Sequence, residues 1–174
     1  LTVKNLEFQG YKERGVRIEV NPGLRIENVE VTQSATGILG GIGLGNPTSK
    51  GAVLKNNYIH DIYGTDGLYF SGDGNSLIEG NVIERVFLNP LEAGPTSSGQ
   101  WANGFGLRVN GGSSHFTVRG NKIKDTGYIG LVVSGKSVGG VNSLVEKNLV
   151  ETSDMTANDG GGISFDFVDG VTFK

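Results

Sequence analysis

The chain has 174 residues, which fits one domain, and its net charge of −3 is too small to favour nucleic acid or an anionic membrane as a partner. It contains no cysteine, so disulfides, thiolate metal sites and a cysteine nucleophile are excluded. The 30 glycines and four prolines, together with many β-branched residues, indicate short strands joined by tight turns rather than collagen or disorder.

A repeat runs through the whole chain and begins with a short strand-like motif that ends in a bend. The motif occupies residues 3–6, 26–29, 54–57, 78–81, 118–121 and 145–148, and residues 171–174 begin a seventh copy. Its apolar positions alternate with polar ones, as expected for a strand with one buried face. Its third position is Asn or Gly except at Lys147, and Asn and Gly tolerate a left-handed backbone. We therefore predict a sharp bend at this position.

Two further strand-like segments complete each repeat. The first centres on an apolar residue two positions after the motif, at Phe8, Val31, Ile59, Ile83, Ile123 and Val150. The second begins with Gly and continues with alternating apolar residues, at residues 15–18, 37–39, 67–70, 106–109, 130–133 and 162–165. Three short strands per repeat, without helical periodicity, predict stacked parallel β-coils, and parallel crossovers are right-handed by strong preference.

We therefore expect an all-β fold, a right-handed parallel β-helix of about six coils. A coil buries its apolar face only against its neighbours, and a bare end would leave open strand edges. We accordingly expect residues 1–174 to be a truncated fragment, part of one β-helix domain that continues beyond both ends.

Two columns of the repeat test this alignment. The outward residue of the first strand alternates in sign, through Lys4, Glu27, Lys55, Glu79, Arg119, Glu146 and Lys174. Because neighbouring coils lie about 4.8 Å apart, this alternation places opposite charges side by side in a solvated, structural ladder. The position after the bend is Asn in four copies, at Asn57, Asn81, Asn121 and Asn148. We predict that these amides hydrogen-bond from coil to coil.

The Asn-x-Ile bend followed by Gly-Ile-x-Val resembles the right-handed parallel β-helix repeats of the pectate-lyase-like superfamily over nearly the whole chain. That superfamily includes polysaccharide lyases, glycoside hydrolases, uronate epimerases, phage tailspikes and non-catalytic surface proteins, so the resemblance specifies a fold and not one activity. In its enzymes the substrate usually lies along the outside of one sheet, between walls made by longer corner loops. The resemblance also implies a secreted or cell-surface location, in a bacterium.

Two insertions leave the same corner of the coil and would form such walls. They span residues 87–103, which include Trp101, and residues 152–159. Long loops on a rigid scaffold often carry function. Beside them we expect the substrate-binding side chains, because aromatic rings next to carboxylates and an arginine suit a sugar. The predicted substrate-binding residues are Arg108, Trp101, Tyr69, His60, Asp66 and Tyr128.

The most informative local motif is Asp159-Gly160-Gly161-Gly162-Ile163 with Asp166 at the end of the following strand. Glycoside cleavage needs two carboxyl groups, one acting as an acid and the other as a base or nucleophile. The motif resembles the site region of some β-helix glycoside hydrolases, including the lacto-N-biosidase type, in which two Asp at this spacing are the catalytic pair. The resemblance assigns Asp159 and Asp166 as catalytic residues.

Three functions remain open from the sequence. The first is hydrolysis of an oligo- or polysaccharide by Asp159 and Asp166. The second is a polysaccharide lyase or epimerase acting on a uronate polymer, for which Arg108, Lys136, His60 and Tyr69 are available. The third is a glycan-binding or structural β-helix without catalysis.

A glycan is the expected partner in all three readings, and no oligomeric state can be read from the sequence. No nucleic acid is expected, and no apolar stretch reaches the roughly 20 residues of a membrane helix. We expect no cofactor and no metal centre. Asp66, Asp154 and Asp159 are nevertheless hard oxygen ligands of the kind that Ca²⁺ prefers.

Overall fold

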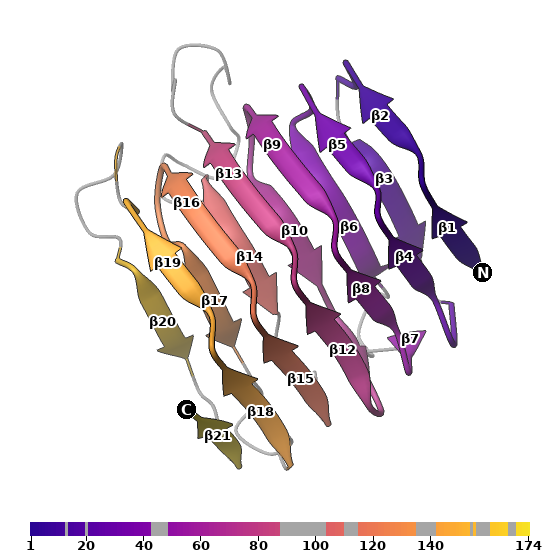
Figure 1. Ribbon diagram of the computed structural model, residues 1–174, viewed down its shortest axis with the longest axis vertical. Coiled ribbons are helices and arrows are strands. Elements are labelled where there is room, and N and C mark those ends of the chain that lie inside the picture. The colour runs from indigo at the N-terminus through magenta and orange to yellow at the C-terminus, as the bar shows by residue number, and fades with distance from the viewer. Residues whose placement is uncertain are drawn as a thin grey trace.

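The computed structural model of the protein describes residues 1–12, 14–19, 21–42, 49–87, 104–109, 115–134, 142–153, 155, 161–166 and 170–174. These residues form strands and no helix. Three parallel sheets, named here sheets A, B and C, run side by side along the whole stack, with sheet C behind the other two in Figure 1. The chain visits A, then B, then C in every coil, so the predicted all-β parallel β-helix is confirmed.

The strands of each sheet follow one another in the order of the sequence. Sheet A consists of β1 (Thr2–Lys4), β4 (Arg25–Glu27), β8 (Val53–Lys55), β12 (Ser76–Glu79), β15 (Phe116–Arg119), β18 (Ser143–Glu146) and β21 (Val171–Phe173). Sheet B consists of β2 (Glu7–Gln9), β5 (Glu30–Thr32), β9 (Tyr58–Ile62), β13 (Val82–Val86), β16 (Lys122–Thr126) and β19 (Leu149–Glu151). Sheet C consists of β3 (Arg14–Glu19), β6 (Thr36–Ile42), β10 (Asp66–Phe70), β14 (Phe105–Val109), β17 (Leu131–Ser134) and β20 (Ile163–Asp166). A small additional sheet pairs β7 (Ser49–Lys50) with β11 (Gly72–Asp73).

The bend between sheets A and B lies where the repeat predicts it. The backbone is left-handed at Asn5, Asn28, Asn56, Gly80, Gly120 and Lys147, with φ between 53° and 64°. The strands before this bend pair in the predicted register, for example Ile26 with Leu54 and Ile78 with Val118. The seventh copy is also confirmed, because β21 pairs with β18.

A second left-handed column, which the sequence analysis does not identify, turns the chain from sheet B towards sheet C. It contains Gly10, Gln33, Asp61, Arg85, Asp125 and Thr152, with φ between 52° and 76°. Only one member is Gly and none is Asn, so the column lacks the composition that marks the first bend. The register of sheet B aligns these positions from coil to coil.

The predicted asparagine ladder is confirmed and is buried at its centre. The Nδ2 atoms of Asn57, Asn81 and Asn121 each donate to the Oδ1 atom of the next Asn, over 2.9, 2.9 and 2.8 Å. Each Nδ2 atom also donates to a main-chain carbonyl of the preceding coil, and each Oδ1 atom accepts a main-chain N–H. The amides therefore satisfy the inner side of the bend, where an unpaired polar group would be costly.

The charge ladder on the outer face of sheet A is confirmed as well. Glu27 pairs with Lys4 at 2.9 Å and with Arg25 at 2.5 Å. Glu79 pairs with Lys55 at 2.8 Å and with Arg119 at 2.7 Å. The lysine and arginine partners are exposed, so each pair adds at most about 1 kcal/mol. Alternation prevents like charges from meeting, and this favours the observed register.

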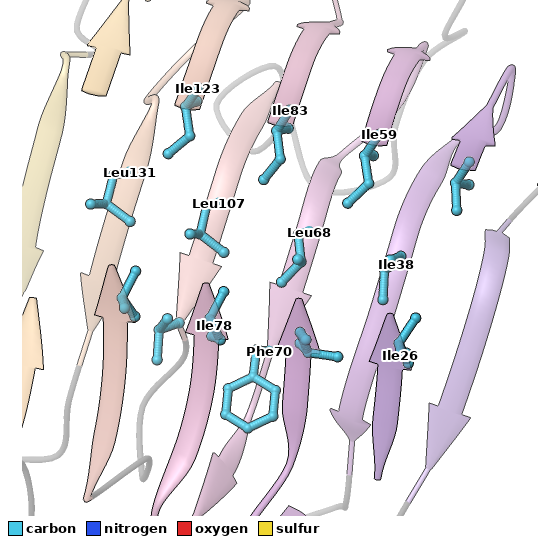
Figure 2. Packing of buried hydrophobic residues seen from close by; sticks show 14 of the residues in the cluster. Ile26, Ile38, Ile59, Leu68, Phe70, Ile78, Ile83, Leu107, Ile123 and Leu131 are labelled. Atoms are coloured by element: carbon cyan, nitrogen blue, oxygen red, sulfur yellow. The ribbon is translucent and has the colours of Figure 1, made fainter. Parts of the chain in front are cut away.

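Inward side chains of the three sheets form one continuous core between them, shown in Figure 2. Ile59, Ile83 and Ile123 point inward from sheet B, opposite Leu68 and Leu107 of sheet C (Figure 2). In the first five coils, the glycine near the start of the sheet C strand lies against a β-branched side chain of sheet B. A Cβ atom at Gly37, Gly67 or Gly106 would overlap a methyl group of Ile59, Ile83 or Ile123 respectively. Glycine is therefore required at this repeat position, because no side chain fits between sheets B and C there.

In the last coil, apolar side chains are exposed at repeat positions whose equivalents in the inner coils are buried. Ile163, Phe165 and Phe173 are 48%, 42% and 41% exposed, whereas Leu107, Val109 and Val118 at corresponding positions are fully buried. The ring centres of Phe165 and Phe173 lie 3.9 Å apart. Both exposed side chains border an apolar hollow.

Replacing Asn81 with Leu should lower the free energy of unfolding by about 3 kcal/mol or more. The change removes the acceptor of the Asn57 main-chain N–H and Nδ2 groups and the donor to the Leu54 carbonyl, and each unpaired buried group costs about 1–3 kcal/mol. Urea unfolding followed by circular dichroism measures the loss. Asn28→Gly, at an exposed left-handed position, is the control and should change stability by less than about 1 kcal/mol. Equal effects of the two variants would contradict a stabilising role for the ladder.

Replacing Lys147 with Gly should raise the free energy of unfolding by about 0.5–1 kcal/mol. Lys147 has φ of 55°, and relief of left-handed strain, about 1–2 kcal/mol, exceeds the entropy cost of a new glycine. Lys122→Gly, within strand β16, is the matched control and should destabilise the protein. Thermal unfolding compares the two variants, and a fall in midpoint for Lys147→Gly would contradict the strain argument.

Candidate functional site

The outer face of sheet C carries the row of side chains in which the sequence analysis placed the ligand. Register aligns Tyr69 of β10 with Arg108 of β14, Val132 of β17 and Ser164 of β20. Leu68 and Leu107, the neighbours of Tyr69 and Arg108 along their strands, are fully buried in the core. Strand alternation therefore directs the aligned row outward.

Arg108 and Asp66 form the principal ion pair of this face. The Nη2 atom of Arg108 donates to Oδ2 of Asp66 over 2.8 Å. Its Nε atom lies 2.8 Å from Oδ1, an ion-pair contact whose angle is too bent for a hydrogen bond. Asp66 is 2% exposed, whereas the Arg108 side chain is 27% exposed. Asp66 thus holds Arg108 from below, and Arg108 is the member of the pair that reaches solvent.

Two aromatic rings enclose the guanidinium group of Arg108. Its central carbon lies 4.8 Å from the centre of the Tyr69 ring and 4.5 Å from that of the Phe105 ring. Tyr128 meets Phe105 edge-on, with ring centres 5.1 Å apart. Cation–π contacts of this kind fix both the position and the orientation of the cation. Arg108, Asp66, Tyr69 and Tyr128, all predicted from the sequence, therefore form one cluster through Phe105.

Burial raises the pKa of Asp66, and Arg108 and the Thr65 side chain act against this rise. The direction follows from desolvation, which disfavours the carboxylate at a site closed to water. Arg108 restrains the shift because its positive charge favours the ionised form. The two residues are consequently coupled, and neither can be changed without affecting the other.

Asp166 lies on the same outer face as this cluster but is not in contact with it. Its strand, β20, is two strands beyond β14, roughly 10 Å away at about 4.8 Å per strand. Asp166 is exposed and accepts a hydrogen bond of 2.9 Å from the Ser164 hydroxyl. The face therefore presents a fixed cation at its centre and an accessible carboxylate nearer the last coil.

His60 lies on the outer face of sheet B, apart from the Arg108 cluster. Its ring stacks on Tyr58, with centres 4.1 Å apart, and its two nitrogens face Glu30 and Asp61. The predicted joint role of His60 and Arg108 in substrate binding therefore requires a ligand that reaches around the corner between the sheets.

Asp159, Trp101 and Asp154 lie outside the described residues, as do Lys136 and most of the two predicted walls. Their assignments stay predictions. Within the described part of the chain, no group of three His, Asp or Glu side chains is arranged to hold a metal ion. Asp66, one of the three residues considered for Ca²⁺, is instead paired with Arg108.

Phe105 is the member of the cluster that sequence reasoning missed. It opens strand β14 directly before Gly106, where the repeat pattern assigns no function. The register pairs it with Asp66, whose Arg108 partner it covers. An aromatic residue aligned with an acid on the neighbouring coil is the signal that could have identified it.

Replacing Arg108 with Met should destabilise the protein by about 3–5 kcal/mol at pH 7, because Asp66 would remain buried without its partner. Without Arg108 the raised pKa of Asp66 rises further, so the folded state binds a proton that the unfolded state releases. The loss of stability should therefore grow as the pH rises above about 4 and shrink in acid.

Urea unfolding at pH 4.5 and pH 7 measures this difference. The double variant Asp66→Asn with Arg108→Met should recover most of the lost stability. Arg119→Met, which breaks an exposed pair on sheet A, is the control and should cost at most about 1 kcal/mol. A pH-independent loss for Arg108→Met would contradict the role assigned to the ion pair.

The comparisons with known proteins agree with the architecture. The family described as right handed beta helix region matches residues 1–174, which is the whole chain. No curated protein and no solved structure gives a significant match. Among the described residues, no helix is long and apolar enough to cross a membrane. The chain therefore belongs to the right-handed β-helix family.

Proposed function

We propose that this β-helix is a glycoside hydrolase that cleaves an oligo- or polysaccharide bound along the outer face of sheet C. The observation that carries the proposal is the placement of Asp166, Arg108 and Tyr69 on one outer face. An exposed carboxylate, a cation fixed by a buried acid and an aromatic ring are the groups with which proteins hold sugars. Family membership supports a carbohydrate-active or surface β-helix.

In the proposed reaction Asp159 and Asp166 supply the two carboxyl groups of glycoside cleavage. One protonates the leaving oxygen, and the other acts as base or nucleophile at the anomeric carbon. Asp166 has the exposure that either role needs, and the Ser164 hydroxyl orients its Oδ1 atom. Arg108 would bind the glycan at a distance of about two coils from Asp166, which is the reach of a ligand larger than one sugar.

The resemblance of the fold also supports a proposal for where the protein acts and what the reaction needs. We propose a secreted or cell-surface protein of a bacterium that acts on a glycan and needs no cofactor for the hydrolysis. The two carboxyl groups provide the acid and the base, so the reaction requires only water in addition to the glycan.

Replacing Asp166 or Asp159 with Asn should lower the turnover of a cleaved glycan by about 10²-fold or more, because Asn can act neither as acid nor as base. The experiment incubates the protein with a panel of glycans and follows new reducing ends and ultraviolet absorbance in the same samples. Asp125→Asn is the matched control, since this carboxyl lies beside Lys124 on strand β16 of sheet B and not on the outer face of sheet C. It should leave turnover unchanged.

The two signals separate the candidate reactions. Reducing ends without a rise in absorbance indicate hydrolysis. A rise in both would indicate elimination on a uronate polymer and would overturn the proposal in favour of a lyase using Arg108. Glycan that binds and is recovered intact would leave a binding module. Full turnover in the Asp159→Asn and Asp166→Asn double variant would also contradict the assignment.

A further inference from the structure

The guanidinium group of Arg108 has one edge that no described residue occupies. Its other edge faces Asp66, through the hydrogen bond from Nη2 and the ion-pair contact of Nε. Nε is buried there, whereas Nη1 is accessible and meets no hydrogen-bond acceptor among the described residues. Nη1 and the outer N–H of Nη2 thus form an open edge through which Arg108 can bind a ligand.

The direction of the open edge is set before any ligand arrives. Asp66, which is 2% exposed, holds the opposite edge. The rings of Tyr69 and Phe105 lie 4.8 and 4.5 Å from the central carbon of the guanidinium group, and Phe105 is 7% exposed. Because these contacts already restrict the arginine side chain, binding at the open edge costs little additional side-chain entropy.

The chemistry of the open edge favours an anion over a neutral group. A guanidinium group has N–H donors and no acceptor, so a sugar hydroxyl can meet it only with an oxygen lone pair. Two parallel N–H groups match two oxygens of one carboxylate or sulfate group, and such charge-assisted bonds are roughly twice as strong as neutral ones. The adjoining rings displace water, and this strengthens the attraction further.

The outward row that contains Arg108 carries no acid that would repel such an anion. The register of sheet C aligns the row from coil to coil as Arg17, Leu39, Tyr69, Arg108, Val132 and Ser164. Among the described residues, the acid in contact with Arg108 is Asp66, which lies at the opposite edge of the guanidinium group. An anion at the open edge is therefore closer to the cation than to this carboxylate.

We propose that the glycan of the proposed reaction is acidic, and that the open edge of Arg108 binds a carboxylate or sulfate group on it. This inference rests on the proposed hydrolysis and names the class of its substrate. Strand β14, which carries Arg108, is two strands from Asp166 on β20, roughly 10 Å at about 4.8 Å per strand. That separation exceeds one sugar ring, so the anionic sugar is not the one whose bond is cleaved. Its binding would act on the reaction from a distance.

The test measures binding of acidic oligosaccharides and of their neutral derivatives to the Asp166→Asn variant, which should not cleave them. Uronate-containing oligosaccharides are compared with the same molecules after reduction of their carboxyl groups to alcohols, and sulfated ones with the same molecules after removal of sulfate. By isothermal titration, the acidic member of one pair should bind about 10–100-fold more tightly, the contribution of hydrogen bonds to a charged group. The pair that shows the preference identifies the anion.

Further variants test whether Arg108 causes the preference. Since Arg108→Met alone leaves Asp66 buried without a partner, the informative variant is Asp66→Asn with Arg108→Met, which should bind acidic and neutral members equally. Arg108→Lys keeps the charge but lacks the paired N–H groups, so it should retain only part of the preference. Arg119→Met, which removes an exposed cation from sheet A, is the control and should retain all of it.

Nuclear magnetic resonance of the wild-type guanidinium group provides a measurement that does not depend on a variant. The acidic oligosaccharide should shift the Nη signals of Arg108 and slow the exchange of their hydrogens with water, and the neutral derivative should not. Equal affinity for the two members of both pairs, unchanged Nη signals, or a preference that persists in the double variant would overturn the inference.

The same oligosaccharides separate this inference from the proposed hydrolysis when turnover by the wild-type protein is followed. Cleavage of neutral glycans without preference for acidic ones would overturn the inference and leave the hydrolysis standing. An acidic oligosaccharide that binds through Arg108 and is recovered intact would support the acidic ligand and contradict the hydrolysis.

Discussion

The close approach of sheets B and C decides where the side chains of the candidate site point. Methyl groups of Ile59, Ile83 and Ile123 occupy the space that a Cβ atom would need at Gly37, Gly67 and Gly106, the second residues of their sheet C strands. With glycine there, the next residue enters the core and the one after it faces solvent. Tyr69 and Arg108 are the outward residues that result. A side chain at Gly67 or Gly106 would separate the two sheets and shift the whole row.

Two polar ladders keep successive coils in the register that this arrangement needs. The buried asparagine amides tolerate no slip, because a shift of one residue would leave their donors and acceptors unpaired inside the core. The outer charges add little energy but make a shifted register unfavourable. Since each coil contacts mainly its neighbours, such constraints act locally and are repeated along the stack. The position of Arg108 therefore depends on the coils directly beside it.

The repeat could be read from the sequence because its signals are periodic. Asn5, Asn28 and Asn56 mark one bend by composition, and Lys4, Glu27 and Lys55 mark the register by charge. The second bend could not be predicted from the sequence, because Gln33, Asp61 and Arg85 have little in common except a left-handed backbone, which tertiary contacts impose on them.

The site was predictable only in part, and for a related reason. Arg108, Asp66 and Tyr69 could be placed near one another from the alignment of their strands. Their roles could not be separated, because burial is not visible in a repeat motif. Asp66 looked like a ligand-binding acid, yet its contacts with Arg108 make it a support for that residue. His60 was assigned to the same groove, although alternation in its own strand directs it to the outer face of sheet B.

The difference between Asp66 and Asp166 shows how one sheet face can hold two acids for different purposes. Desolvation makes the carboxylate of Asp66 costly, and it is retained beside a cation that it fixes between two rings. An acid held in this way is closed to solvent, so a ligand could reach it only if Arg108 moved aside. Asp166 has the opposite properties, since it is exposed and held by one neutral hydroxyl. The proposed reaction therefore assigns proton transfer to the Asp166 end of the face and glycan recognition to the Arg108 end.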